Sequence, residues 1–125
     1  MATVEVTDNN FREIVERDGI VILDFWAEWC GACRSFAPVY EAASEKHSDV
    51  VFGKVDADAA TRLSISTGIR ALPTVAVYRD SIRVFFQAGA LPKPALEDLI
   101  GQVRALDMDR VRAELDAHGS GHVHS

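Results

Sequence analysis

Apolar positions along this chain follow two different spacings, and the alternation between them predicts a protein of mixed strands and helices. Five short stretches are either continuously apolar or alternate with polar residues, which is typical of β-strands; they are residues 3–6, 20–27, 50–55, 74–78 and 82–86. The stretch at 20–27 is almost entirely apolar apart from Asp24. Continuous apolar character indicates a central strand that is buried on both faces, as in parallel sheets.

Between these stretches the apolar residues recur every three or four positions, as they do on one face of a helix. The first such segment passes through Phe11, with Asp8 as its expected N-cap and Gly19 near its C-terminal end. The second follows the central strand and contains Pro38. Because proline has no backbone N–H, we expect Pro38 to kink this helix.

A shorter helix is expected over residues 58–67, with Gly68 at its end, and a last helix from Pro92 through residue 103. Only residues 79–81 separate the last two strands, which predicts a tight hairpin turn. Strands that alternate with helices predict an α/β fold with a mostly parallel sheet, to which the hairpin adds antiparallel strands at one side. Helices should cover both faces of this mixed sheet of about five strands.

Composition narrows the class of protein. The chain has 125 residues, of which 48% are hydrophobic, so one domain can bury a core without the help of a disulfide. Its net charge of −6 argues against nucleic-acid binding, which requires basic patches. The first residues lack the basic and apolar segments of a signal peptide. No apolar run approaches the ~20 residues that span a membrane. We therefore expect a cytoplasmic protein that binds neither membranes nor nucleic acid.

The most informative motif is Trp29-Cys30-Gly31-Ala32-Cys33, which contains the only two cysteines of the chain. Two thiols separated by two residues can close and reopen a small disulfide, so the pair is a candidate redox switch. A structural staple is disfavoured because the loop that it would close is minimal. A zinc site lacks a second cysteine pair, and we expect no bound metal. Two buried core cysteines remain an alternative at this point.

Cys30 is expected where the central strand gives way to the following helix. Free backbone N–H groups and the partial positive charge of a helix N-terminus favour a thiolate over a thiol. Since the thiolate is the reactive form of cysteine, we expect Cys30 to be the nucleophile that attacks a substrate disulfide. Cys33 lies one helical turn later on the same face, from which it can release the substrate.

Beyond the cysteine motif, several segments occur in the order found in thioredoxins: residues 24–33, Pro38, 54–56, 68–74 and 89–90. A lone C-x-x-C is a weak signal. A strand, W-C-G-x-C, a helix with proline five residues on, and a later Leu-Pro-Thr before a strand are specific together. The chain therefore resembles the thioredoxin family over roughly residues 3–106, which implies the thioredoxin fold. We expect a thioredoxin domain at 1–106, with 107–125 forming a helical extension and a disordered tail from Gly119.

The resemblance also implies roles for individual residues. In thioredoxins an aspartate beneath the disulfide helps to move a proton from the resolving cysteine, and Asp24 stands at the matching position. Lys54, expected on the neighbouring strand, would tune Asp24 electrostatically. Pro73 matches the family's cis-proline, which would free the backbone of Leu72 to pair with an extended substrate. The alternatives are an outward-facing Asp24, a solvated Lys54 and an ordinary trans Pro73. The other residues expected to contact substrate are Trp29, Gly31, Ala32, Gly89 and Ala90.

Ala32 departs from the family pattern, in which proline usually precedes the second cysteine. Unlike proline, alanine supplies a backbone N–H, which could donate toward the sulfur of Cys30. We therefore expect a more stabilised thiolate, and a less reducing disulfide, than in a Cys-Gly-Pro-Cys relative.

Together these features favour a protein-disulfide reductase, an enzyme that performs thiol–disulfide exchange through Cys30 and Cys33. The resemblance implies disulfide-containing protein substrates, no bound cofactor, and electrons that arrive from NADPH through a thioredoxin reductase-like flavoprotein; we expect a monomer. Two alternatives remain. One is a disulfide oxidant or isomerase, for which an exporting signal would be expected, and the other is a scaffold subunit without essential redox activity.

Overall fold

Within the described residues, the sheet has five strands, which run in both directions. The computed structural model describes the backbone of residues 2–122 and the side chains of residues 2–117. The strands are β1 (Thr3–Glu5), β2 (Ile20–Trp26), β3 (Val51–Asp56), β4 (Thr74–Arg79) and β5 (Ile82–Ala88). Their order across the sheet is β1-β3-β2-β4-β5. The first three are parallel, and the β4–β5 hairpin continues the sheet in antiparallel fashion on one side, which confirms the predicted mixed sheet.

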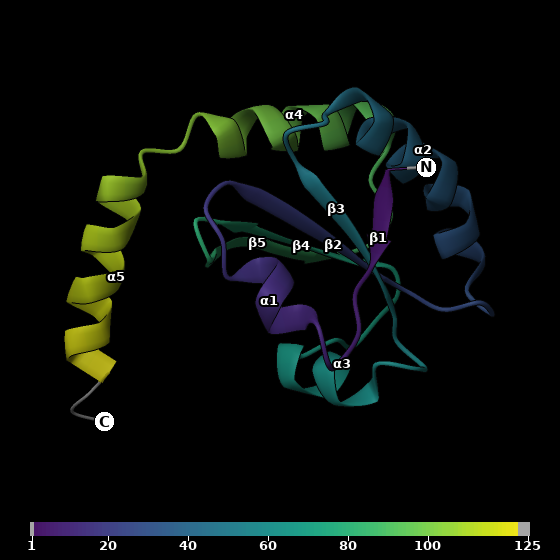
Figure 1. The fold of residues 1–125 in the computed structure, drawn as a ribbon, viewed down its shortest axis with the longest axis horizontal. Helices are drawn as coiled ribbons and strands as arrows, with labels where there is room; N and C mark the ends of the chain where they lie inside the picture. The colour runs from purple at the N-terminus through teal and green to yellow at the C-terminus, as the bar shows by residue number, and fades with distance from the viewer. Residues whose placement is uncertain (1, 123–125) are drawn as a thin grey trace.

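Helices cover both faces of this sheet, as predicted (Figure 1). They are α1 (Phe11–Val15), α2 (Gly31–Lys46), α3 (Thr61–Thr67), α4 (Lys93–Arg104) and α5 (Met108–His122). One hydrophobic cluster joins the inner sides of α2 and α4 to the sheet, and a second joins α1 and α3 to its other face. None of the helices in the described part of the chain has the length and hydrophobicity that a membrane span requires.

The central strand β2 is buried on both faces, as its apolar run predicted. Val21, Leu23 and Phe25 belong to the cluster under α1 and α3. Ile20 and Ile22 belong to the cluster under α2 and α4. Side chains alternate along a strand, so the next position on this second face is Asp24. The fold thus places one carboxyl group in a row of buried aliphatic side chains.

The predicted cap of the first helix is wrong. The residue that precedes α1 is Asn10, whose side chain makes no capping hydrogen bond, and the helix ends at Val15, with Glu16 as its C-cap, rather than near Gly19. The carboxylate of Asp8 accepts a hydrogen bond from the amide of Leu63 at 2.8 Å, in the first turn of α3. The chain before α1 passes beside the start of α3, so Asp8 satisfies a free N–H of a helix that is distant in sequence.

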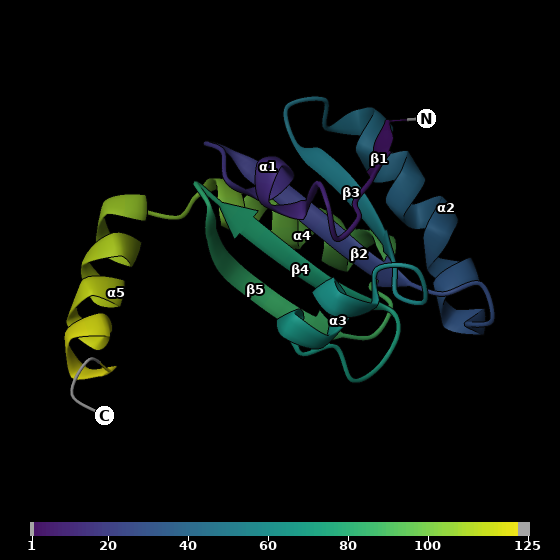
Figure 2. The same cartoon turned by 60° about the horizontal axis from the view of Figure 1, so that its bottom comes forward.

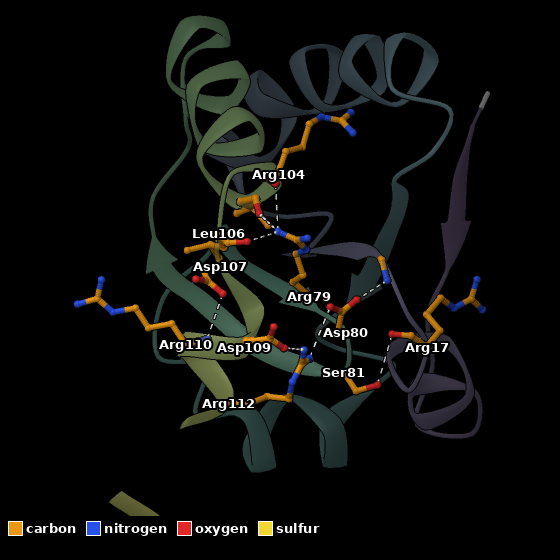
Figure 3. Close-up of polar contacts among 12 residues, drawn as sticks. Arg17, Arg79, Asp80, Ser81, Arg104, Leu106, Asp107, Asp109, Arg110 and Arg112 are labelled. Carbon is orange, nitrogen blue, oxygen red and sulfur yellow. Dashed lines mark hydrogen bonds and ion pairs between the residues drawn. The ribbon is translucent and has the colours of Figure 1, made fainter. Parts of the chain in front are cut away.

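The hairpin turn is where the sequence predicts it, and it connects to other parts of the fold. Asp80 and Ser81 both have positive φ, at 50° and 72°, as two-residue turns that match the strand twist require. The carboxylate of Asp80 accepts a hydrogen bond from the amide of Gly19 at 2.8 Å. The turn is thereby joined to the loop between α1 and β2 (Figure 3).

Helix α4 ends at Arg104 and a separate helix, α5, begins at Met108, where a continuation of the last helix was expected. The guanidinium of Arg79 donates to the carbonyls of Val103, Arg104 and Leu106 at 2.7, 3.1 and 3.0 Å. These bonds supply donors to carbonyls at and just after the end of α4, where a helix offers few backbone donors. The start of α5 is anchored, since Met108 is buried, but the helix then projects away from the sheet (Figures 1 and 2).

The last residues that the structure describes are helical. Helix α5 continues to His122, whereas the sequence predicted a disordered tail from Gly119. Residues 123–125 of that tail lie outside the described residues. The domain boundary at residue 106 stays a prediction.

Candidate active site

The two cysteines lie at the junction between the end of β2 and the start of α2. Cys30 is the N-cap residue of α2, with the extended backbone that N-caps favour, and Cys33 occupies the first helical turn. The two residues form a disulfide across a Cα–Cα distance of 5.2 Å. The sulfur of Cys30 accepts a hydrogen bond from the amide of Cys33 at 3.1 Å. The sequence therefore predicted both the position of the pair and a donor at the helix start, but the donating amide is that of Cys33 rather than Ala32.

Burial differs sharply within the motif. Both cysteines are almost covered, at 5% and 4% exposure, and pack with Ala27 and the partly buried Trp26 and Leu72. The neighbouring Trp29 is 69% exposed. Its indole N–H donates to the carboxylate of Asp58 at 2.9 Å, which holds the ring beside the motif. The disulfide is thus buried beside an exposed aromatic side chain, that of Trp29.

Two further loops of the predicted site are joined to each other. The peptide bond between Leu72 and Pro73 is cis, as the resemblance implied. The amide of Gly89, which has a φ of 110°, donates to the carbonyl of Pro73 at 2.8 Å. Because glycine has no Cβ, Gly89 adopts this φ without strain. Pro73 itself is buried and Leu72 is half-buried.

The structure brings most of the predicted substrate-contacting residues to the surface. Exposed side chains or backbone belong to Trp29, Gly31, Ala32, Gly89 and Ala90. These residues come from the loop before α2, the first turn of α2 and the loop after β5. Leu72 belongs to the same apolar cluster as the cysteines, so the loop before β4 lies next to the disulfide.

Asp24 is the buried acid of this region. It is 1% exposed, and its Oδ1 atom has no hydrogen-bond partner in the described part of the chain. Burial raises the pKa of Asp24 from 3.8 to about 7, because the charged form loses its hydration, while the nearby charge of Lys54 acts in the opposite direction. The predicted outward-facing alternative is thereby excluded for Asp24.

Lys54 lies on β3 directly opposite Asp24 in the strand register. Its ammonium group also lies 5.1 Å from the centre of the Trp26 ring, within reach of a cation–π interaction. A cavity of about 150 Å³ is lined by Lys54 and Cys33 together, along with Trp26, Ala27, Glu28, Arg34 and Ala37. Lys54 therefore shares a cavity with Cys33 and is the register partner of the buried Asp24.

Three side chains around this site were not among the predicted site residues. Asp58 binds the indole of Trp29, and Arg34 donates to the carbonyl of Glu28 at 2.6 Å. The third is Tyr40 of α2, whose side chain is fully buried between the helix and the sheet. Asp58 could have been found from the sequence, because the carboxyl ends of the parallel strands β2 and β3 meet at the same edge of the sheet.

Comparisons with known proteins all find that this chain is similar to thioredoxins. The family profile described as Thioredoxin matches residues 2–102. A thioredoxin-like protein of Streptomyces coelicolor is 52% identical over 111 residues, which cover 89% of this chain and 83% of the relative. A thioredoxin of Coprinus comatus is 43% identical over 78% of this chain and 94% of its own. The solved structure of spinach chloroplast thioredoxin F is similar with a TM-score of 0.77 and 33% identity, over 83% of this chain and 95% of that one.

Proposed function

Since this chain belongs to the thioredoxin family and is a protein-disulfide reductase, we propose that Cys30 is its nucleophile and Cys33 its resolving thiol. The thiolate of Cys30 attacks one sulfur of a substrate disulfide, whose S–S bond breaks as a mixed disulfide forms. The substrate's other sulfur leaves as a thiolate and takes a proton. Cys33 then attacks the sulfur of Cys30, which releases the second substrate thiol and leaves the Cys30–Cys33 disulfide. Two electrons pass from the dithiol to the substrate.

The position of Cys30 at the start of α2 supports this division of work. Its sulfur already accepts the amide of Cys33 in the disulfide form. After reduction, the same amide and the helix N-terminus favour a thiolate at Cys30. Cys33 is as buried as Cys30 and lies one turn further into the helix. It needs to lose its proton before it can attack.

Asp24 is our candidate acceptor for that proton. A carboxyl with a pKa raised to about 7 exchanges protons near neutral pH, whereas one near 3.8 would stay ionised. Lys54, opposite Asp24, would stabilise the Asp24 carboxylate when it carries no proton. We propose that protons move between Cys33 and Asp24 through solvent that reaches the cavity lined by Cys33 and Lys54.

The loops around the disulfide are our candidate substrate surface. We propose that the backbone of Leu72, before the cis Pro73, pairs with an extended substrate segment. Trp29 would offer an apolar contact, and Gly31, Ala32, Gly89 and Ala90 would let a substrate chain approach closely.

For the electron supply we propose an NADPH-dependent flavoprotein reductase that regenerates the dithiol. We further propose that the protein acts as a monomer in the cytoplasm, on protein disulfides. The thioredoxin domain would end at residue 106, and the segment at 107–125 would be an addition to it.

The experiment is an insulin reduction assay with dithiothreitol, comparing the protein with Cys30→Ser and Cys33→Ser. We expect Cys30→Ser to be inactive and Cys33→Ser to accumulate a mixed disulfide that mass spectrometry detects. If Cys30→Ser reduced insulin as well as the unaltered protein, the assigned nucleophile would be wrong. The standard potential of the Cys30–Cys33 pair then measures how strong a reductant the dithiol is.

A further inference from the structure

Tyr40 is a buried polar residue for which the proposed reaction has no use. It lies on the inner stripe of α2, which also carries Cys33, Phe36 and Ala43. Its exposure is 0%, and its ring contacts Phe36 and Phe52 at centroid distances of 5.6 and 5.3 Å. An apolar side chain would fill this space without the cost of burying a hydroxyl group.

The hydroxyl of Tyr40 bridges the two central strands. It lies 3.0 Å from the carbonyl oxygen of Ile22 on β2 and 2.8 Å from that of Gly53 on β3. A single O–H shared between two carbonyls holds both strands to the same point of α2. These carbonyls come two residues before Asp24 and one residue before Lys54, which are register partners.

The strand alternation places the acid on the same side as this bridge. Ile22 packs into the cluster that contains Tyr40, and Asp24 follows it by two residues. Phe52 packs into the same cluster, and Lys54 follows it by two residues on β3. The carboxyl of Asp24 and the phenol of Tyr40 therefore face the same interior layer, under the helix that begins at the disulfide.

We infer that Tyr40 is a positioning residue, whose hydroxyl sets how tightly Asp24 holds its proton by fixing the two strands that carry Asp24 and Lys54. This inference rests on the proposed function only in that Asp24 is the proton acceptor there. Burial raises the pKa of Tyr40 well above its ordinary value, and the charge of Asp24 raises it further.

The surroundings of Asp24 define the expected direction. Lys54 lies opposite it on β3, Tyr40 of α2 packs into the same interior layer, and β4 places the apolar Val75 opposite. Ile22 and Gly53 lie inside paired strands, and without the hydroxyl their carbonyls lose the donor that Tyr40 adds to the sheet. Their less compensated negative ends then disfavour a further negative charge nearby. Asp24 should then hold its proton more tightly.

The test uses Tyr40→Phe, which keeps the ring and removes only the hydroxyl. The titration of the Asp24 carboxyl carbon is followed by NMR in the disulfide form, so that no thiol titrates in the same range. We expect the midpoint to move upward relative to the unaltered protein. Tyr40→Met, which fills similar space without a hydroxyl, should shift it in the same direction and serves if the phenylalanine variant does not fold.

Ser64→Ala is the matched control. It also removes a buried hydroxyl that donates to a backbone carbonyl, that of Ala60, but Ser64 lies in α3, whose side chains pack on the opposite face of the sheet. An unchanged Asp24 midpoint in both Tyr40 variants overturns the inference. An equal shift in Ser64→Ala overturns it too, since the cause would then be a general loosening of the fold.

The pH profile of insulin reduction separates this inference from the proposed function. If the Asp24 titration and the rate profile both move in Tyr40→Phe, both ideas are supported. If the titration moves and the rate profile does not, the role of Asp24 in the reaction is refuted while the role of Tyr40 toward Asp24 stands.

Discussion

Replacing Asp24 by asparagine should stabilise the protein, and only at neutral and alkaline pH. In the unfolded chain the carboxyl ionises around its ordinary value of 3.8, whereas in the folded protein its pKa is about 7. Between these values the folded protein binds a proton that the unfolded chain does not, so stability falls as pH rises. The loss is complete above about pH 7 and absent below about pH 4.

The size of the effect follows from that difference. About 1.4 kcal/mol per pKa unit gives about 4 kcal/mol between the two plateaus. This figure needs little discount for solvent, because Asp24 is only 1% exposed and its Oδ1 has no hydrogen-bond partner within the described residues. Asparagine has nearly the shape of the protonated acid and never ionises. The variant should therefore match the unaltered protein near pH 4 and exceed it by about 4 kcal/mol near pH 8.

Urea unfolding of both disulfide forms, from pH 4 to pH 9, measures this difference directly. Asp98→Asn serves as the control, because Asp98 is an exposed carboxylate of α4. A stability difference between Asp24→Asn and the unaltered protein that does not change with pH would refute the reasoning. It would show that Asp24 has a similar proton affinity in the folded and unfolded states.

Three further predictions concern single positions elsewhere. A Cβ on Gly53 would lie 2.7 Å from side-chain atoms of both Leu23 and Val6, so Gly53→Ala should lose about 1–3 kcal/mol of unfolding free energy; urea unfolding with an unchanged midpoint would contradict this. Arg79→Met keeps the aliphatic stem but removes a donor from three carbonyls at and just after the end of α4, and should also cost about 1–3 kcal/mol, as thermal unfolding can show. Ala32→Pro removes one of the first-turn amides of α2, which contribute to the positive end of the helix beside Cys30, so glutathione equilibration should give a more reducing couple. An Ala32→Pro variant that is equally or more oxidising would refute that expectation.

Much of the fold could be predicted from local patterns. The apolar run of β2 required burial on both faces, and the structure provides two hydrophobic clusters for it. The short connection between β4 and β5 permitted little other than a hairpin. Gly68, with a φ of 86°, ends α3 as expected, because glycine tolerates the left-handed backbone that closes a helix. These signals lie within a few residues of the structure that they specify.

The errors concern interactions across long sequence distances. Asp8 has a side chain suited to capping the next helix, but it binds the amide of Leu63, 55 positions later. The break before α5 carries no proline, and it coincides with the guanidinium of Arg79, which comes from β4. The partner of Trp29 is Asp58, on the chain that follows another strand. A local pattern states which groups need partners, whereas the packing of the elements selects the partner.

The sequence by itself determined the chemistry of this protein: two thiols at one helical turn, a helix start that favours a thiolate, and a carboxyl inside an apolar strand. Those properties depend on spacing and residue type, which are visible along the chain. Only the tertiary structure decided how that carboxyl behaves. The pKa of Asp24 depends on its burial under α2 and on Lys54 from β3, and Tyr40 reaches the same strands from a third element. Electrostatic interactions depend on distance in space and on exclusion of water, and both arise only once the chain has folded.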